Sequence, residues 1–219
     1  MMRELRFGRT GAAQGQGRSL VVFLHGYGAD GADLLGLADV MASQLPGAVF
    51  VAPDAPDRCA AGGFGYQWFP IPRFDGSTDA ERDAGIANSV SDLNAFLDAR
   101  LLEEGLTDDR LALVGFSQGA MMSLEIAPRR DPAMAGVVAI SGRLMRPEAL
   151  SAEAVVKPPV LLIHGDQDPV VPFDEMARAG DALVAAGFQT FGHVMQGTGH
   201  GIAPDGLGVA LQFLQERLG

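Results

Sequence analysis

The sequence contains one cysteine, few basic residues and no long hydrophobic run, and each shortage excludes a class of protein. Cys59 has no partner for an internal disulfide and fits a reducing compartment. Sixteen Lys and Arg residues against 27 Asp and Glu give a formal charge of -11, which argues against nucleic acid or an anionic membrane surface as a partner. No apolar stretch is long enough for stable membrane insertion, and no hydrophobic signal core follows the first residues. We therefore expect a cytoplasmic protein.

Sequence patterns for bound cofactors are missing as well. None of the four histidines stands at a metal-ligand spacing from another histidine or next to the cysteine. Neither a G-x-G-x-x-G fingerprint nor a phosphate-binding P-loop occurs in the chain. We expect neither a metal nor a cofactor.

The order of apolar segments predicts the fold class. Hydrophobic residues make up 47% of the chain and charged residues 20%, which is ordinary for a globular protein with a substantial core. Short apolar runs alternate with longer amphipathic ones, a pattern typical of an α/β fold with a mostly parallel central sheet and helices on both faces. No linker divides the chain, so we expect one domain over residues 1–219 without a separate cap domain.

Individual elements are predicted from the same pattern. Strands are expected at residues 20–24, 49–52, 111–114, 136–140, 160–163 and 188–195, with a further edge strand at 5–7. Helices are expected at 32–43, 79–103, 119–127, 173–186 and 205–217. Thr78 and Glu81 have the spacing of a capping box at the start of the second helix. The Gly/Gln-rich stretch at 11–17 is expected to be a hairpin loop, and the long loop at 53–78 is expected to be functional.

A serine stands at a sharp turn between a predicted strand and a predicted helix. The segment Gly115-Phe116-Ser117-Gln118-Gly119 follows the apolar run 111–114 and leads directly into the next helix. A serine hydroxyl becomes a useful nucleophile only when it is exposed, has a base beside it and faces donors for the developing oxyanion. The G-x-S-x-G pattern between strand and helix meets the first need, and it predicts Ser117 as a nucleophile.

Chain order limits the candidates for the base. If Ser117 is the nucleophile on an α/β-hydrolase sheet, the acid and then the base must follow it along the chain. His25 and His164 do not meet this requirement. His193 belongs to an alternating run that is typical of a strand. His200 lies in the Gly-rich loop 197–201, from which its imidazole can reach the serine, and is predicted as the base.

Two aspartates follow the strand at 160–163 and are candidates for the acid. Asp166 and Asp168 both lie in the segment from His164 to Pro172. An aspartate in such a turn often only caps backbone N–H groups. Spacing alone does not choose between the two.

The motifs together resemble the bacterial carboxylesterase and phospholipase group of α/β-hydrolases, which also contains acyl-protein thioesterases. The resemblance extends over nearly the whole chain. It is carried by Phe23 to Asp30, by the Ala52-Pro53-Asp54-Ala55-Pro56 segment, by Trp68-Phe69, by the turn around Ser117, by His164 to Pro172, and by Gly199-His200-Gly201.

The resemblance implies an α/β-hydrolase fold and assigns the remaining catalytic positions. The H-G-x-x-D-x-V-V-P motif of the family places its acid at Asp168, which leaves the capping role to Asp166. The implied triad is Ser117, Asp168 and His200, with His200 as the base and Asp168 holding the imidazole in orientation. The family forms half of its oxyanion hole in the early His-Gly turn.

By the same resemblance, the oxyanion donors are the backbone N–H groups of Tyr27 and Gln118, and His25 is a brace behind them. Trp68 and Phe69 are expected beside the acyl pocket, where an apolar wall is needed; packing in the core is the alternative. Pro70 departs from the Trp-Phe-Asp that eukaryotic thioesterases of the family commonly have, so substrate choice stays open.

These features predict a serine carboxylesterase that hydrolyses short- to medium-chain acyl esters through an acyl-enzyme intermediate. Thioesters and lysophospholipids are plausible further substrates. The alternatives are a dedicated acyl-protein thioesterase and, in a different class, a catalytically silent hydrolase fold that only binds ligands. The expected partner is a small-molecule ester; the oligomeric state, monomer or homodimer, stays open.

Overall fold

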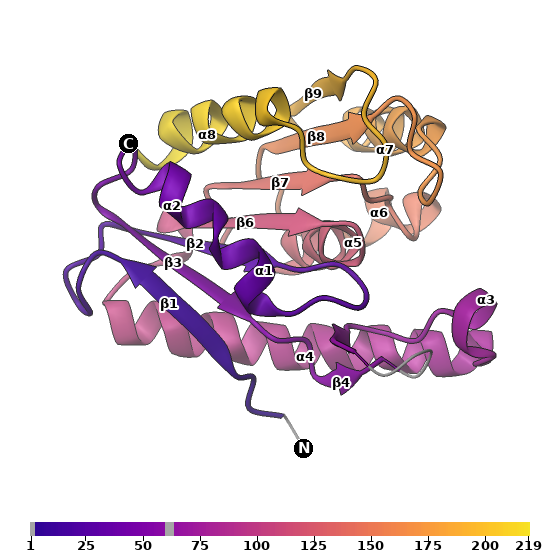
Figure 1. Cartoon of the computed structure of the whole chain (residues 1–219), viewed down its shortest axis with the longest axis horizontal. Coiled ribbons are helices and arrows are strands. Elements are labelled where there is room, and N and C mark those ends of the chain that lie inside the picture. The colour runs from indigo at the N-terminus through magenta and orange to yellow at the C-terminus, as the bar shows by residue number, and fades with distance from the viewer. Residues whose placement is uncertain (1–2, 60–63) are drawn as a thin grey trace.

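The computed structural model describes residues 3–59 and 64–219 and is built around a seven-stranded sheet with the order β1-β3-β2-β6-β7-β8-β9 (Figure 1). Only β1 runs antiparallel to its neighbour; the other pairs are parallel. The strands are β1 Phe7–Gly11, β2 Ser19–Leu24, β3 Ala48–Pro53, β6 Leu111–Phe116, β7 Gly136–Ile140, β8 Val160–Gly165 and β9 Thr190–Met195. A separate two-stranded ladder joins β4 Asp57–Arg58 to β5 Tyr66–Gln67.

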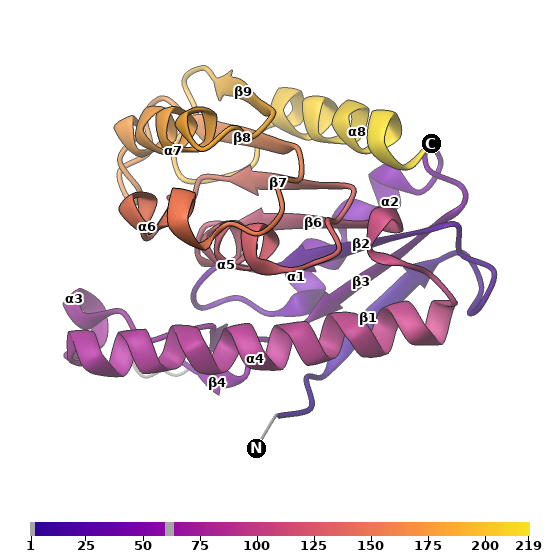
Figure 2. The same ribbon diagram turned by 180° about the vertical axis from the view of Figure 1, so that it is seen from behind.

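Helices cover both faces of the sheet. They are α1 Gly31–Leu35, α2 Leu37–Met41, α3 Pro72–Asp75, α4 Asp79–Glu104, α5 Gln118–Ile126, α6 Pro147–Glu153, α7 Asp174–Ala185 and α8 Pro204–Leu218, with 3-10 turns at Asp108–Arg110 and Ala127–Arg129. Helices α1, α2 and α8 lie over the face seen in Figure 1, and α4 to α7 lie over the opposite face, seen in Figure 2. The described part of the chain shows no separate cap domain beyond these layers.

Each face has its own apolar core because successive strand residues point to opposite sides. On β2, Val21 and Phe23 pack with residues of α1, α2 and α8, whereas Leu20, Val22 and Leu24 pack with α4, α5 and α7. Both sets are fully buried. A sheet covered on both faces explains why its strands read as continuous apolar runs rather than as alternating ones.

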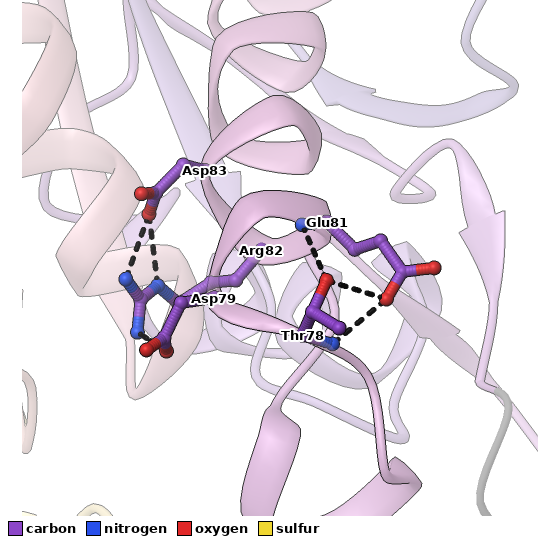
Figure 3. Close-up of polar contacts among 5 residues, drawn as sticks. All are labelled: Thr78, Asp79, Glu81, Arg82 and Asp83. Atoms are coloured by element: carbon purple, nitrogen blue, oxygen red, sulfur yellow. Dashed lines mark hydrogen bonds and ion pairs between the residues drawn. The ribbon is translucent and has the colours of Figure 1, made fainter.

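The long helix α4 begins with the capping box that the sequence predicts. Thr78 Oγ1 accepts a hydrogen bond from the Glu81 N–H, and the Glu81 carboxylate accepts one from the Thr78 N–H (Figure 3). The helix ends at Gly105, which has the left-handed conformation that favours glycine. None of the described helices is both long and apolar enough to cross a lipid bilayer.

Most predicted elements are confirmed, and those whose bounds differ most from the prediction lie at the beginning of the chain. The predicted strands from Leu20 onward are all present, with ends within two residues of those expected. The helix expected at 32–43 is divided at Gly36 into two short helices. The edge strand expected at 5–7 is present, but it begins two residues later than expected and runs from Phe7 to Gly11.

The prediction of a hairpin loop at residues 11–17 is wrong. Strand β1 pairs antiparallel with β3, which lies between β1 and β2. The Gly/Gln-rich segment therefore crosses to a strand that is not the neighbour of β1. The sequence analysis did not predict α3, α6 or the β4–β5 ladder. These elements are too short to show a helical or strand period in their apolar residues.

Candidate active site

The carboxyl ends of the parallel strands meet at one edge of the sheet, and the loops that follow them carry the predicted site residues. Ser117 follows β6 in a strained conformation, with φ 54° and ψ -115°, which residues other than glycine seldom adopt. Its N–H donates to the Ile140 carbonyl oxygen at 2.9 Å. The turn needs both flanking glycines: a Cβ on Gly115 would lie 2.4 Å from the Gly119 oxygen, and one on Gly119 would lie 1.9 Å from the Leu24 oxygen.

The structure brings Ser117, His200 and Asp168 together in a hydrogen-bonded row. His200 Nε2 lies 2.9 Å from Ser117 Oγ, and His200 Nδ1 lies 2.7 Å from Asp168 Oδ2. An ionised carboxylate can only accept, so the Nδ1 proton points toward Asp168 and Nε2 is left to accept the serine proton. This is the geometry of a nucleophile, a base and an orienting acid.

Asp168 is held as a buried carboxylate. Burial by itself would raise the pKa of Asp168, but the hydrogen bonds from His200 and from the N–H groups of Val171 and Val170 outweigh it, and the pKa lies below its ordinary value. The two N–H donors are 2.9 and 2.8 Å from Oδ1. The acid therefore stays ionised beside the imidazole at neutral pH.

A second histidine, which sequence reasoning set aside, contacts the same carboxylate. His164 is buried at the end of β8, and its Nε2 lies 3.3 Å from Asp168 Oδ2 and 3.0 Å from the Val171 oxygen. Both neighbours are acceptors, so Nε2 carries the proton. The side chain thereby holds the acid loop closed; its place at the start of the H-G-x-x-D motif was the signal that could have found it.

The two other candidates for the acid and the base, Asp166 and His193, make contacts outside the row of Ser117, His200 and Asp168. The Asp166 carboxylate accepts from the Gly197 N–H at 2.7 Å and so fastens the acid loop to the loop that carries His200. His193 lies on β9 and pairs with Asp205, with 2.8 Å between Nε2 and Oδ2; this hydrogen bond lowers the pKa of Asp205. The structure does not bring His193 into the row with Ser117.

The turn after β2 lies against the serine. A Cβ on Gly26 would be 3.3 Å from Ser117 Cβ and 3.2 Å from Phe116 Cδ1, so the turn that contains Tyr27 packs closely on the nucleophile turn. Gln118 is the first residue of α5, and the N–H of a first helical residue has no partner within the helix. Both backbones are thus next to Ser117, as an oxyanion hole requires.

His25 braces this turn from inside the protein. Its side chain is fully buried, with Nδ1 2.7 Å from the Gly26 oxygen and Nε2 accepting from the Ala55 N–H at 2.9 Å. Burial lowers the pKa of His25. The ring is therefore neutral and carries its proton on Nδ1, which suits a brace and leaves it no free nitrogen for chemistry.

The side chain of Gln118 connects the nucleophile turn to the Trp68-Phe69 segment. The sequence analysis did not predict this contact. Its Oε1 accepts from the Trp68 N–H at 2.8 Å, and its Nε2 donates to the Phe69 oxygen at 2.7 Å. The Trp68 indole N–H in turn donates to the His25 oxygen at 2.9 Å. This buried network holds the two halves of the site in register.

The expectation that Trp68 walls an acyl pocket needs correction. Its side chain is 0% exposed and packs in the core with Leu24 and Leu93. The indole is directed at the backbone of the turn after β2, because that is where its buried N–H finds an acceptor. Trp68 therefore supports the site from behind and does not line it.

Phe69 does line a groove beside the nucleophile turn. The groove has a volume of about 270 Å³ and contacts Met121, whose N–H donates to the Ser117 oxygen at 3.1 Å. One side is formed by the segment 69–73 and the other by 170–172 of the acid loop. Its walls are mainly apolar, as the acyl part of an ester requires, and three arginines (Arg73, Arg82 and Arg143) also line it.

Other reactive chemistry finds little support in the part of the chain that the structure describes. Residues 3–59 and 64–219 contain no cluster of three His, Cys, Asp or Glu side chains suited to a metal ion. Cys59 is buried, its thiol donates to the Tyr66 oxygen at 3.2 Å, and burial raises the pKa of that thiol. A raised pKa lowers the thiolate fraction and with it the reactivity.

Comparison with known proteins gives the same classification. Residues 9–218 match the phospholipase/carboxylesterase family. Acyl-protein thioesterase 1 of Neurospora crassa is 30% identical over 213 residues, which cover 90% of this chain and 86% of that protein. The crystal structure of esterase PE8 superposes with a TM-score of 0.92 at 43% identity, over 99% of this chain and 100% of PE8.

A plant relative shares the fold at lower identity. The structure of acyl-protein thioesterase 2 of Zea mays has a TM-score of 0.78 and 24% identity, and the match covers 98% of this chain and 99% of that one. The resemblance and the α/β-hydrolase fold predicted from the sequence are thus confirmed. The chain is an α/β-hydrolase of the phospholipase/carboxylesterase family.

Proposed function

We propose that this protein hydrolyses carboxylic esters of short- and medium-chain acids, with Ser117 as the nucleophile. The observation that carries the proposal is the hydrogen-bonded row from Ser117 Oγ through His200 to Asp168. A strained serine that touches a correctly oriented imidazole has little purpose in a protein that only binds ligands. Esterase PE8, at 43% identity, supports the same reaction class.

In the proposed first half-reaction, Ser117 Oγ attacks the ester carbonyl while its proton passes to His200 Nε2. The carbonyl oxygen becomes an oxyanion, which the backbone N–H groups of Tyr27 and Gln118 stabilise. The intermediate then collapses: the C–O bond to the alcohol breaks, and His200 returns the proton to the departing oxygen. The acyl group remains on Ser117 as an ester.

Deacylation repeats these steps with water in place of serine. His200 removes a proton from water, the resulting hydroxide attacks the acyl carbon, and the acid leaves as Ser117 Oγ recovers its proton. Asp168 accepts from Nδ1 throughout, which fixes the imidazole tautomer and stabilises the imidazolium that forms in each half-reaction. The reaction consumes one water and requires no cofactor.

The groove beside Phe69 is the proposed acyl site. Its mainly apolar walls and modest volume favour a small-molecule ester over a long-chain lipid. The curated relatives are named acyl-protein thioesterases, so thioesters are the second candidate class. The residues that act on an ester would act on a thioester in the same way, and only relative rates separate the two.

We assign the protein to the cytoplasm because its single cysteine fits a reducing compartment.

A fluorophosphonate probe tests the proposal against a binding module of the same fold. An activated serine reacts with the probe in a one-to-one ratio, whereas an ordinary serine does not. Intact-mass measurement should show one adduct on the wild-type protein and none on Ser117→Ala. Failure of the wild-type protein to label would favour the binding module. A rate series over p-nitrophenyl esters, an acyl-thioester and a lysophospholipid then separates the substrate classes.

A further inference from the structure

The groove beside the nucleophile turn is mainly apolar but also has charged side chains in its wall. Five charged residues line it: Arg73, Arg82, Arg143, Asp79 and Glu175. Pairing among them and with their neighbours decides which charges remain available to a substrate.

Three of the five, Arg82, Asp79 and Glu175, are engaged in ion pairs. Arg82 lies between two carboxylates, at 2.6 Å from Asp79 Oδ1 and 2.8 Å from Asp83 Oδ1 (Figure 3). Glu175 pairs with Arg178 at 3.1 Å. Both acidic residues of the groove are therefore ion-paired, each with an arginine that it shares with a second carboxylate, Asp83 on Arg82 and Asp174 on Arg178.

The other two, Arg73 and Arg143, have no such partner. Arg73 reaches across the groove and donates to the Val170 carbonyl oxygen at 3.2 Å, a contact that leaves its charge uncompensated. Arg143 follows β7 and is exposed on the groove wall. Among residues 3–59 and 64–219, no carboxylate lies within ion-pair distance of either guanidinium.

The position of Arg73 and Arg143 in the groove indicates what kind of substrate they could bind. The whole chain has a formal charge of -11, so its overall field repels anions. Within the groove, however, two guanidinium groups without a carboxylate partner are free to bind an anionic substrate. A charge beside apolar walls is screened less than one in open water. Arginine also matches the planar, two-oxygen geometry of carboxylates and the oxygens of phosphates.

We propose that the groove selects esters that carry an anionic group, held by Arg143 and Arg73 while the ester carbonyl lies at Ser117. This inference rests on the proposed esterase function and adds the substrate class. The anion belongs either to the far end of the acyl chain or to the alcohol. Both sources present the same oxygens to the guanidinium groups, and the experiment distinguishes them.

The test compares matched charged and neutral esters. For the acyl side, mono(4-nitrophenyl) adipate is compared with 4-nitrophenyl hexanoate, which has the same number of acyl carbons and no charge. For the alcohol side, the hexanoyl ester of 3-hydroxybenzoate is compared with that of 3-hydroxybenzamide. We expect the wild-type kcat/KM to be about three- to fivefold higher for the charged member of at least one pair, the range of one partly exposed ion pair.

Substitutions of Arg143 test whether the preference for charged esters arises in the groove. Arg143→Gln should remove most of it by lowering kcat/KM for the charged ester only, and Arg143→Lys should restore part of it. Arg18→Gln is the matched control: Arg18 is also exposed and also lacks a carboxylate partner among the described residues, but it precedes β2 at the opposite edge of the sheet. It should leave both ratios unchanged.

Salt gives an independent measurement on the wild-type protein. Raising NaCl from roughly 0.05 to 0.5 M should bring the charged and neutral rates together, because screening weakens only the ionic contact. Equal rates for both pairs, or a preference that Arg143→Gln leaves intact, would overturn the inference. Hydrolysis of the neutral esters tests the esterase function itself, so the two failures are distinguishable.

Discussion

The indole N–H of Trp68 donates to the main-chain oxygen of His25 at 2.9 Å, and this bond connects the protein core to the turn that carries the proposed oxyanion donor Tyr27. Trp68 is fully buried, so the bond is shielded from water. The tryptophan thus has a more specific task than filling space, although it lies away from the groove. Its effect on catalysis is exerted through the backbone of residues 25–27.

Trp68→Phe and Trp68→Ala should separate the contribution of the indole hydrogen bond to catalysis from that of the ring's packing to stability. Trp68→Phe keeps most of the ring but leaves the His25 oxygen without its donor, so we expect kcat to fall by roughly tenfold, the equivalent of about 1.4 kcal/mol, with KM little changed. Trp68→Ala should in addition lower the free energy of unfolding by about 3 to 5 kcal/mol. Steady-state kinetics and urea unfolding on the same preparations measure both effects.

Phe213→Leu is the control, because Phe213 packs with the opposite core cluster. It should lower stability without changing the kcat of the folded fraction. If Trp68→Phe behaves like this control, the tryptophan only packs the core. A changed preference for acyl chain length in Trp68→Ala would instead revive its place in the pocket.

Asp168→Asn should cost far more activity than Asp166→Asn. An amide at position 168 no longer favours the proton on His200 Nδ1, so the imidazole loses the tautomer that can accept from Ser117, and we expect kcat to fall by on the order of 10⁴. The Asp166 carboxylate accepts only from the Gly197 N–H among the hydrogen bonds described, and its loss should lower kcat by less than about tenfold. The reverse order in measured kcat would show that Asp166 is the acid.

The buried His25 should make stability depend on pH. Burial lowers its pKa in the folded protein, whereas the unfolded chain binds a proton near the ordinary value of about 6.5. Between the folded and the unfolded pKa the unfolded state holds more protons, so the stability is fully present above about pH 6.5 and is lost as pH falls below it, by up to about 1.4 kcal/mol per pH unit. Urea unfolding from pH 7.5 to 5 measures this slope.

His25→Asn identifies the source of that slope. The asparagine can still form hydrogen bonds but does not titrate, so its unfolding free energy should change less between pH 7 and 5 than that of the wild type. His193→Gln is the control, since His193 is a partly exposed strand residue paired with Asp205. Equal slopes for wild type and His25→Asn would contradict the assignment of a neutral, buried imidazole.

Sequence reasoning predicted Ser117 and His200 because each lies in a short motif directly after a predicted strand. Parallel strands bring such loops to one edge of a sheet. Chain order removed His25 and His164 as candidates for the base, and the alternating pattern around His193 removed the third. The acid needed the family resemblance, since nothing local separates Asp168 from Asp166. For the serine and the histidine the determining physics is local, so the sequence pattern alone could predict them.

The contacts that sequence reasoning missed are made across long separations. Gln118 binds the backbone of Trp68 and Phe69, about 50 positions away, and no periodicity predicts which buried side chain meets which carbonyl group. Trp68 was misplaced for the same reason, because an aromatic residue in an aperiodic loop suits a core and a pocket wall equally well. The pairing of β1 with β3 likewise depends on the assembled sheet, not on the turn between neighbours.

The most direct test of the account is to trap the acyl group on the protein. A p-nitrophenyl ester mixed with excess enzyme and quenched in acid within milliseconds should leave one acyl group, which peptide mapping by mass spectrometry assigns to Ser117. Ser117→Ala should carry no acyl group and should turn over at least about 10⁴-fold more slowly. An acyl group on another residue, or a Ser117→Ala protein that keeps more than about a tenth of the wild-type kcat, would contradict the assignment of Ser117 as the nucleophile.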